Sequence, residues 1–444
     1  MLRKATILST LGALALAGCS EREEILPGNR MNVRDVLETR ADPLAQDPGN
    51  SARAVALGAQ GSNADWAQSG VSPFARTTHA AFSGAFQPIW QTSIGAGDSR
   101  RKRLNADPVV AGGRIYTLDS EHVVRATSTS GEALWSRDLT PLRDKNYEAQ
   151  GGGIAVEGGR LYVASGFGTV SALDPASGAE LWVQRLGNTA TGAPSVRDGV
   201  VYLVSGDSVG WALEADSGRI RWQVEGVGDV ANVAGAPSPA IGDERVVFSF
   251  GNGTVQAVFR QGGLGLWSVD LLGRRNGVAL AGIDDITGDP LIVGDRVYAG
   301  NHSGNFVALS VHDGERLWTA REGALGPAWP LGSDSVVFVS DRNELVRLDA
   351  ATGDKIWAVD LPGYVPTRRN PQKRRDAAYA NHGPILAGGR LIVASSDGFI
   401  RAFDPENGSE VSKVAIKGGA TTRPVVAGGV LYVVSGDGVL HAYR

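Results

Sequence analysis

The sequence predicts an all-β fold, an eight-bladed β-propeller, from its composition and from one repeated phrase. The chain of 444 residues contains 60 Gly and many short runs of Val, Ile and Tyr, which is typical of β-structure dense in turns. A phrase of the form Asp-x-x-x-Gly-x-x-x-Trp, first seen complete at Asp174–Trp182, returns every 40 to 50 residues. Such an interval indicates a repeat architecture.

Each repeat contains four predicted strands, as the one that ends at Trp182 illustrates. Its first strand begins near Gly153, and the turn Gly158-Gly159 suits a hairpin because Gly tolerates positive φ. The second strand, Arg160–Ala164, alternates apolar side chains, and the third is Thr169–Leu173. Four short antiparallel strands make one propeller blade.

The repeat count gives eight blades and a closed ring. First strands are predicted near Pro108, Gly153, Pro194, Pro239, Pro290, Pro330, Pro384 and Pro424. The fourth-strand markers are Trp90, Trp135, Trp182, Trp222, Trp267, Trp318 and Trp357, with Val411 in place of an eighth Trp. The last repeat has three strands, so the N-terminal strand Ile89–Thr92 is expected to complete it and remove the exposed edge. The Trp side chains are expected to fill gaps between neighbouring sheets rather than to stack on ligands.

The N-terminus predicts a lipoprotein signal peptide over residues 1–18. Two basic residues precede an apolar stretch, Ala5–Leu16, that is too short to span a bilayer. The sequence Leu16-Ala17-Gly18-Cys19 resembles the bacterial lipobox, which implies that Cys19 is lipidated and that the protein is anchored by acyl chains. The alternative is a signal peptide with an incidental Cys. Residues 19–62 are predicted to be a flexible tether, and residues 63–444 the propeller.

The net charge argues against a nucleic-acid-binding protein, and the cysteine content excludes an internal disulfide. The net charge of −4 does not suit a nucleic-acid binder, which would be strongly basic. With one Cys, no internal disulfide can form.

The repeated phrase resembles the blade motif of pyrroloquinoline-quinone-type propellers. Two families share that motif: the quinoprotein dehydrogenases and the BamB family of outer-membrane assembly lipoproteins. The segment Trp66–Gly70 also resembles the short N-terminal segment of these proteins. The resemblance covers residues 63–444 and does not by itself separate the two families.

Chemistry separates them. A quinone-dependent dehydrogenase needs a quinone bed, a Ca²⁺ held by oxygen ligands and a carboxylate base, and the family often has a vicinal Cys pair. This chain has only Cys19, and its six His are scattered without metal-ligand spacing. We therefore expect no catalytic residue, no cofactor and no metal, and a protein that is not an enzyme. A periplasmic quinone-dependent dehydrogenase and a binding propeller with another partner remain as alternatives.

The loops from each fourth strand to the next first strand leave on one face of a propeller, and they differ in length. The longest follow Trp267 and Trp357. These loops carry most of the basic runs, Arg100–Arg103, Arg143 with Lys145, Arg274-Arg275, and Arg368–Arg375. Recognition tends to lie on such loops, so this face is a predicted docking face. The alternative is ordinary solvated charge, because acidic residues are interspersed.

The resemblance to BamB implies a partner and contact positions. In that family the partner is BamA, which contributes a periplasmic POTRA domain, and the contacts lie in two of these loops. One matches Ala231–Ala234, where Val233 is kept and Ala234 replaces an Arg. The other matches Asp285–Pro290, where Asp285 is kept and Thr287 replaces an Asp. Arg274 and Arg275 are expected to supply the missing positive charge.

The resemblance implies a scaffold lipoprotein on the periplasmic face of the outer membrane. It would bind BamA and other components of the assembly (BAM) complex and assist the insertion of β-barrel proteins. Two modes of action are open: orienting the partner's periplasmic domains, or holding unfolded outer-membrane proteins on exposed sheet edges.

Overall fold

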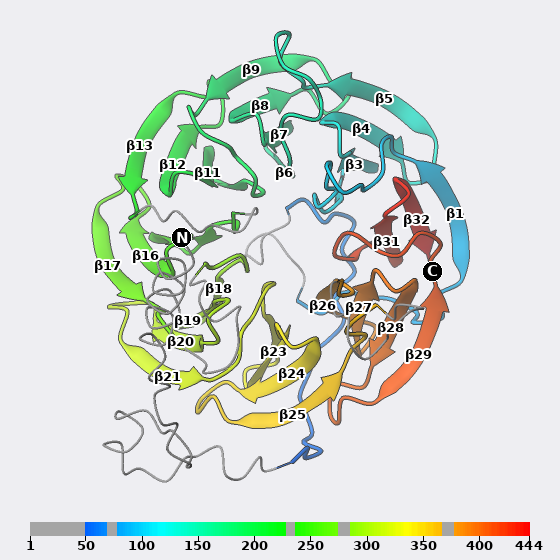
Figure 1. Ribbon diagram of the computed structural model, residues 1–444, viewed down its shortest axis with the longest axis vertical. Coiled ribbons are helices and arrows are strands. Elements are labelled where there is room, and N and C mark those ends of the chain that lie inside the picture. Colours follow the sequence, from blue (N-terminus) through cyan, green and yellow to red (C-terminus); the bar gives the residue numbers. More distant parts are fainter. Residues whose placement is uncertain (1–48, 69–77, 228–235, 274–284, 366–376) are drawn as a thin grey trace, which may run out of the picture. The chain divides into compact units, whose positions relative to one another are not determined.

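The computed structural model describes residues 49–68, 78–227, 236–273, 285–365 and 377–444, and within these ranges the chain is all-β. Eight four-stranded antiparallel sheets are arranged as a ring (Figure 1), which confirms the predicted propeller. We name the sheets blades A to H. No helix among the described residues is long and apolar enough to cross a membrane.

The strands of blades A to D are β2 (Val109–Ala111), β3 (Arg114–Leu118), β4 (Val123–Ser128) and β5 (Ala133–Asp138) in A; β6 (Gly152–Glu157), β7 (Arg160–Ser165), β8 (Thr169–Leu173) and β9 (Glu180–Arg185) in B; β10 (Ser195–Arg197), β11 (Val200–Ser205), β12 (Val209–Glu214) and β13 (Ile220–Glu225) in C; and β14 (Ala240–Ile241), β15 (Arg245–Ser249), β16 (Thr254–Phe259) and β17 (Gly265–Asp270) in D.

The strands of blades E to H are β18 (Leu291–Val293), β19 (Arg296–Gly300), β20 (Phe306–Ser310) and β21 (Arg316–Ala320) in E; β22 (Trp329–Leu331), β23 (Ser335–Val339), β24 (Glu344–Asp349) and β25 (Lys355–Asp360) in F; β26 (Asn381–Ala387), β27 (Arg390–Ser395), β28 (Phe399–Phe403) and β29 (Glu410–Ala415) in G; and β30 (Val425–Ala427), β31 (Val430–Ser435), β32 (Val439–Tyr443) and β1 (Pro88–Ser93) in H.

The ring is closed by β1, as the sequence predicts. This N-terminal strand pairs antiparallel with the C-terminal strand β32 and becomes the outermost strand of blade H. Two backbone hydrogen bonds extend the pairing, from Gln87 N–H to the Arg444 carbonyl at 2.8 Å and from Arg444 N–H to the Gln87 carbonyl at 2.9 Å. The two ends of the propeller sequence are thereby held in one sheet.

The Trp of each fourth strand joins its blade to the next blade. Trp135 of blade A covers Gly178 in the turn between β8 and β9 of blade B, so closely that a Cβ added to Gly178 would lie 2.6 Å from the indole ring. The indole N–H donates to the Pro175 carbonyl of the same turn at 3.1 Å, and the Tyr116 hydroxyl donates to that carbonyl at 3.0 Å. The turn phrase therefore needs Gly because the neighbouring Trp occupies the space of a side chain.

The same Trp–Gly contact recurs around the ring. The pairs are Trp90–Gly131, Trp135–Gly178, Trp182–Gly218, Trp222–Gly263, Trp267–Gly314, Trp318–Gly353 and Trp357–Gly408.

The expectation that Val411 replaces the eighth Trp is wrong by one position. Opposite the third strand, Ser412 pairs with Ala402 just as Trp182 pairs with Ala172. Val411 is 49% exposed, like Leu181 at 50%, which precedes Trp182. The physical reason for the missing Trp is the ring closure: β32 and β1 come from opposite ends of the propeller sequence, so no chain turn joins them and offers a Gly.

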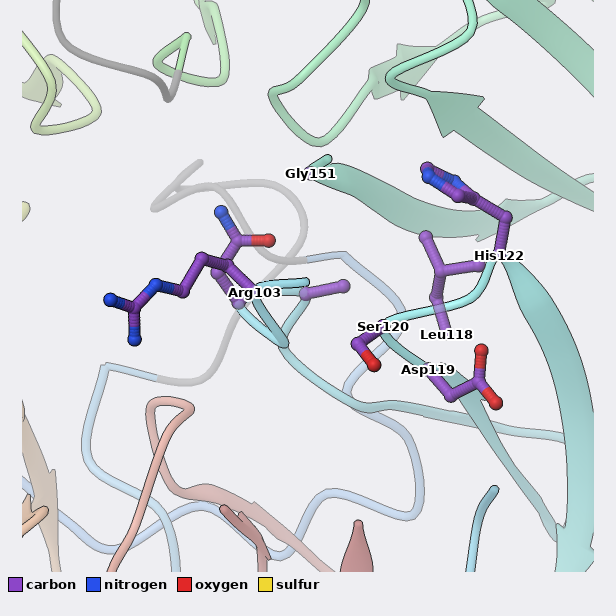
Figure 2. Close-up of a pocket in the computed structure, with 8 residues that line it drawn as sticks. Arg103, Leu118, Asp119, Ser120, His122 and Gly151 are labelled. Atoms are coloured by element: carbon purple, nitrogen blue, oxygen red, sulfur yellow. The ribbon is translucent and has the colours of Figure 1, made fainter. Parts of the chain in front are cut away.

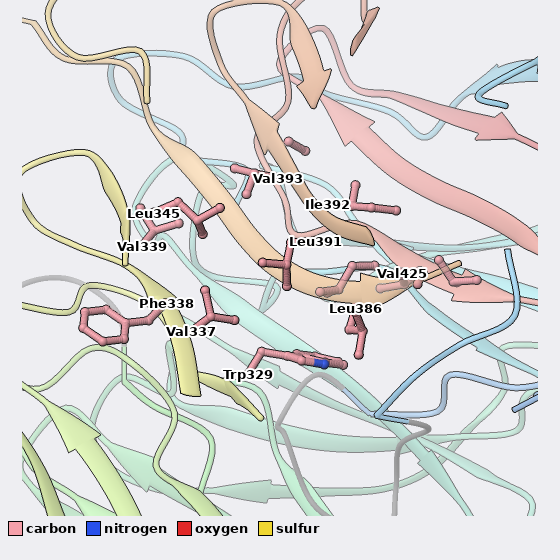
Figure 3. Close-up of a cluster of buried hydrophobic side chains, with 14 of the residues drawn as sticks. Trp329, Val337, Phe338, Val339, Leu345, Leu386, Leu391, Ile392, Val393 and Val425 are labelled. Atoms are coloured by element: carbon pink, nitrogen blue, oxygen red, sulfur yellow. The ribbon is translucent and has the colours of Figure 1, made fainter. Parts of the chain in front are cut away.

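The segments that precede β1 line the innermost strands. Trp66 exchanges two backbone hydrogen bonds with Val110 of β2, and the Gln68 side-chain amide bonds to the backbone N–H and carbonyl of Val196 in β10. The Trp66 ring stacks on Trp329 of β22 with centroids 5.9 Å apart. Trp329 continues into the largest cluster of buried apolar side chains, with Val337 and Leu386 (Figure 3). These segments thus connect blades that are not neighbours in the ring.

The compact unit begins at Gly49, so the predicted tether overlaps it by residues 49–62. Ser51 and Arg53 donate backbone hydrogen bonds to the carbonyls of Ile356 and Glu406. The Arg53 guanidinium pairs with Asp349 at 2.6 Å, and its carbonyl accepts a bond from the fully buried Arg347 at 2.8 Å. These contacts fix residues 50–53 on blades F and G.

Charged side chains from opposite sides of the ring meet on its axis. Arg423, which precedes β30, pairs with Asp107 before β2 and with Asp289 before β18, the latter at 3.0 Å. Blades A and E, which carry the two carboxylates, lie on opposite sides of the ring (Figure 1). Burial opposes the charged form of Arg423, but the two carboxylates outweigh that effect and raise its pKa. Removing one partner of such a buried set leaves an unpaired charge, which costs about 3–5 kcal/mol.

His382 in β26 lies near this cluster, because Asp107 and Arg423 are among the charged groups that act on its imidazole. Burial, aided by Arg423 and opposed by Asp107 and Asp98, lowers the pKa of His382 to about 4. The folded protein therefore keeps this imidazole neutral.

The Trp–Gly contact predicts a difference between two alanine substitutions. Gly178 and Gly158 both have positive φ, +73° and +58°, so each Gly→Ala change should cost about 1–2 kcal/mol of unfolding free energy. At Gly158 no atom lies within 4 Å of an added Cβ, whereas at Gly178 the Trp135 ring must move, which should cost a further ~1–3 kcal/mol. Urea unfolding measures both, and equal losses would contradict the role of the contact.

Acid should destabilise the ring partly through His382. Its pKa is about 4 when folded and near 6.5 when unfolded, so the unfolded chain binds the extra proton between these values. The stability contribution is present above pH 6.5 and is lost as the pH falls towards 4, by on the order of 2–3 kcal/mol. Urea unfolding at pH 7, 5.5 and 4 should show a shallower pH dependence for His382→Gln. Identical pH slopes for the variant and the parent chain would refute this assignment.

Candidate docking face

The connections from each fourth strand to the next first strand share one face with the turns between second and third strands. Backbone hydrogen bonds tie the two sets together, because Leu139 bonds to His122, Leu186 to Gly168 and Leu361 to Asn343, all within 3.1 Å. The two longest connections are residues 271–290 and 361–380, as the sequence predicts. We call this side of the ring, with all eight connections, the docking face.

The basic run Arg100–Arg103 belongs to the connection between β1 and β2. Half of it is paired: Lys102 forms an ion pair with Glu121, and Arg103 pairs with Asp98 at 2.9 Å. Arg100 and Arg101 are exposed. The interspersed acids therefore neutralise part of the run, as the alternative interpretation of this loop expects.

Four of the six predicted contact residues lie outside the described residues: Val233, Ala234, Arg274 and Arg275. The basic run Arg368–Arg375 also lies outside them.

The remaining two residues, Asp285 and Thr287, lie at the base of the docking face. Asp285 is only 3% exposed, and its carbonyl accepts a bond from the His302 N–H at 3.0 Å. The Thr287 hydroxyl donates to the Leu325 carbonyl at 3.0 Å, so its 2.9 Å contact with His302 Nε2 places the proton on that nitrogen. Burial lowers the pKa of His302, which keeps the ring neutral in this role. Thr287 thereby connects the loops on either side of blade E.

Asp285 also borders a cavity of about 430 Å³ between blades B, C and D. Hydroxyl groups are prominent in its wall, from Thr189, Thr191, Ser205 and Ser208. Most of its lining residues lie on the connections and the second-to-third-strand turns of the docking face.

The docking face also has an apolar component, which was not predicted from the sequence. Six large apolar side chains on its connections are more than 40% exposed: Leu142, Tyr147, Val227, Leu272, Leu325 and Tyr364. We call them the exposed apolar loop residues. The last four lie on four consecutive connections, those that follow β13, β17, β21 and β25. A large apolar residue inside an otherwise polar loop is the sequence signal that could have identified them.

The pocket in Figure 2 illustrates how the polar residues of this face are used. It lies beside the turn between β3 and β4, which carries Asp119 and His122. The Asp119 carboxylate accepts backbone N–H bonds from Glu121, Val123 and Ala96 within 2.9 Å. It therefore holds the turn against the connection that follows β1.

His122 contacts Ser165, a pairing that the sequence did not predict. The distance from Nδ1 to the Ser165 hydroxyl is 3.1 Å, and burial lowers the pKa of His122. Ser165 is fully buried at 0% exposure, so a substrate could not reach its hydroxyl without opening the blade. Within the described ranges, no three His, Cys, Asp or Glu side chains are grouped so that they could hold a metal ion.

Comparison with solved structures places the ring among known propellers. The crystal structure of BamB from Moraxella catarrhalis superposes with a TM-score of 0.63 at 20% identity, covering 80% of this chain and all of that one. The quinohemoprotein alcohol dehydrogenase from Comamonas testosteroni superposes with a TM-score of 0.62 at 15% identity, covering 86% of this chain and 80% of that one. At such identities the two similarities show the shared fold alone.

Sequence comparison separates the families. The outer membrane protein assembly factor BamB of Moranella endobia is 25% identical over 337 residues, 74% of this chain and 83% of that protein. BamB of Escherichia coli is 25% identical over 328 residues, 73% of this chain and 80% of that protein. The sequence profile of the family described as outer membrane protein assembly factor BamB matches residues 119–359 and 355–444. Since these matches span well over half of its length, the chain belongs to the BamB family of outer membrane protein assembly factors.

Proposed function

We propose that this protein is a non-catalytic scaffold lipoprotein of the outer-membrane assembly complex. It docks a periplasmic POTRA domain of BamA and assists the folding and insertion of β-barrel proteins. The observation that carries the proposal is the position of the exposed apolar loop residues, which gather on the docking face of a ring that belongs to the BamB family.

The composition of the docking face suits a protein partner. Interfaces bury apolar and aromatic side chains at their centre and keep charged groups at the rim. Here Leu272, Leu325 and Tyr364 stand on adjacent connections, while Arg100 and Arg101 are exposed on the connection after β1. The apolar group can supply binding energy, and the arginines can steer an acidic partner.

The six contact residues that the resemblance implies divide into two groups under this proposal. Val233, Ala234, Arg274 and Arg275 remain proposed contacts. Asp285 is buried and Thr287 bonds to neighbouring loops, so these two would act by shaping the base of the docking face.

The quinone-dependent dehydrogenase is the weaker candidate. Its support is a fold similarity at 15% identity, whereas the BamB profile matches the sequence itself. The single Cys of the chain also leaves no vicinal pair of the kind often found beside the quinone.

Changing apolar residues of the docking face to charged ones should weaken the complex with BamA. In the double variant Leu272→Glu/Leu325→Glu, two exposed side chains would place charge in the proposed interface centre, and BamA recovery should fall at least tenfold in affinity isolation from detergent-solubilised membranes. Folding should be unaffected, since both side chains are on the surface.

Leu264 provides the matched control. It is 71% exposed, but it lies in the turn between β16 and β17, on the opposite face of the ring. Leu264→Glu should leave BamA recovery unchanged. If the control lost BamA and the double variant kept it, the docking face would be misassigned.

The lipid anchor makes a separate prediction. We propose that Cys19, which lies outside the described residues, carries the acyl chains that hold the protein on the periplasmic face of the outer membrane. Cys19→Ala removes the only thiol of the chain, and fractionation should then move the protein out of the outer-membrane pellet. Unchanged membrane attachment would show that another element holds it there.

A further inference from the structure

The outer edge of one blade is already occupied by an extended piece of this chain. Ser51 donates its backbone N–H to the Ile356 carbonyl of β25 at 2.9 Å. The Asn50 side-chain amide acts as a second backbone unit, accepting from the Ala358 N–H at 2.9 Å and donating to the Ala358 carbonyl at 2.8 Å. Because Asn50 meets Ala358 and Ser51 meets Ile356, the segment runs antiparallel to β25.

This segment covers a position that is open on other blades. Ile356 directly precedes Trp357, the fourth-strand Trp of β25, and is 5% exposed. The equivalent residues Leu134, Leu181 and Leu317 are 45%, 50% and 44% exposed. In the part of the chain that the structure describes, an exposed apolar side chain beside an unpaired fourth-strand edge therefore recurs on several blades, and blade F shows the kind of ligand that fits such an edge.

Among the open edges, that of β9 in blade B is the most apolar. Leu181 before the Trp and Val183 after it are both exposed, at 50% and 42%. On the other open edges the residue after the marker position is polar: Gln91, Ser136, Gln223, Ser268, Thr319 and Lys413. Natural proteins usually protect such edges with charges or Pro, and β9 has neither at its centre.

The backbone of β9 offers the same hydrogen-bonding groups as that of β25. Val183 pairs with Ser171 of the third strand as Ala358 pairs with Val346, and both ladders shift register at the same place. Val183 therefore directs its N–H and carbonyl outward, as Ala358 does, and Leu181 directs its carbonyl outward, as Ile356 does. A strand added there would gain main-chain bonds and apolar contacts together.

We propose that the outer edge of β9 binds an extended segment of an unfolded β-barrel protein by antiparallel strand addition. Strands of membrane barrels alternate apolar and polar residues, so one face of such a segment matches Leu181 and Val183. The inference rests on the proposed function, since that function brings the client to this protein, and it assigns the client an edge separate from the docking face.

A peptide-binding measurement tests the edge directly. The probe is a fluorescently labelled ten-residue peptide that alternates Val, Leu or Tyr with Thr or Gln, titrated with the full-length protein in detergent. The comparison peptide is N-methylated at alternate residues, which removes the hydrogen bonds of one strand edge and keeps every side chain. We expect at least tenfold weaker binding of the methylated peptide; equal binding would overturn strand addition.

Matched substitutions locate the site. Val183→Pro removes an outward N–H that the ladder does not use, and Ser136→Pro does the same at the equivalent position of β5. Val183→Pro should weaken peptide binding at least tenfold, and Ser136→Pro should leave it unchanged. Leu181→Lys and Leu134→Lys repeat the comparison with the backbone intact, should the proline variant fail to fold. Equal effects at both members of a pair would overturn the assignment to β9.

BamA recovery distinguishes this inference from the function on which it rests. Val183→Pro and Leu181→Lys should still recover BamA from membranes, because they lie off the docking face. Loss of peptide binding with BamA retained supports the proposal. Retained peptide binding in both variants refutes the edge and leaves the scaffold function standing.

Discussion

The contact between a fourth-strand Trp and the turn Gly of the next blade is the interaction on which the structure depends. Each Trp, such as Trp135, fills the space above a Gly, and all of them except Trp222 also donate the indole N–H to a carbonyl of the same turn. Burying an aromatic side chain contributes about 2–3 kcal/mol, and the contact recurs at seven of the eight junctions between blades. The eighth junction follows Ser412, where the neighbouring blade is closed by β1 and β32 and no such turn exists. The Gly and Trp of the repeated phrase therefore recur because they form the contacts between neighbouring blades.

A second set of contacts connects blades that are not neighbours. Arg423 pairs with carboxylates before β2 and β18, and the stacked rings of Trp66 and Trp329 bring the N-terminal segment onto the inner strands. Because these contacts connect the inner strands of several blades, the connections of the docking face start from a rigid ring. That rigidity matters for a scaffold, because a preorganised surface loses less entropy on binding.

The blades could be predicted from sequence because each one is a local pattern: Pro before the first strand, Gly pairs in the hairpins, and Trp182 eight positions after Asp174. The prediction at Val411 was wrong because the same spacing of eight positions, counted from Asp404, leads to Ser412. The contacts of Arg53, Gln68 and Arg423 could not be predicted, since they join residues separated by more than a hundred positions. The exposed apolar loop residues were missed because exposure depends on the assembled ring, and Asp285 appeared accessible in the sequence yet is buried.

The scaffold account depends on the docking face meeting BamA in the cell, and site-specific photo-crosslinking tests this most directly. A photoreactive amino acid is placed at Leu272 on the docking face and, in a second strain, at Leu264 on the opposite face, both positions being exposed. The account predicts a crosslinked adduct with BamA from position 272 and none from position 264. An adduct from position 264 alone, or none from position 272 in a folded and membrane-anchored protein, would contradict it.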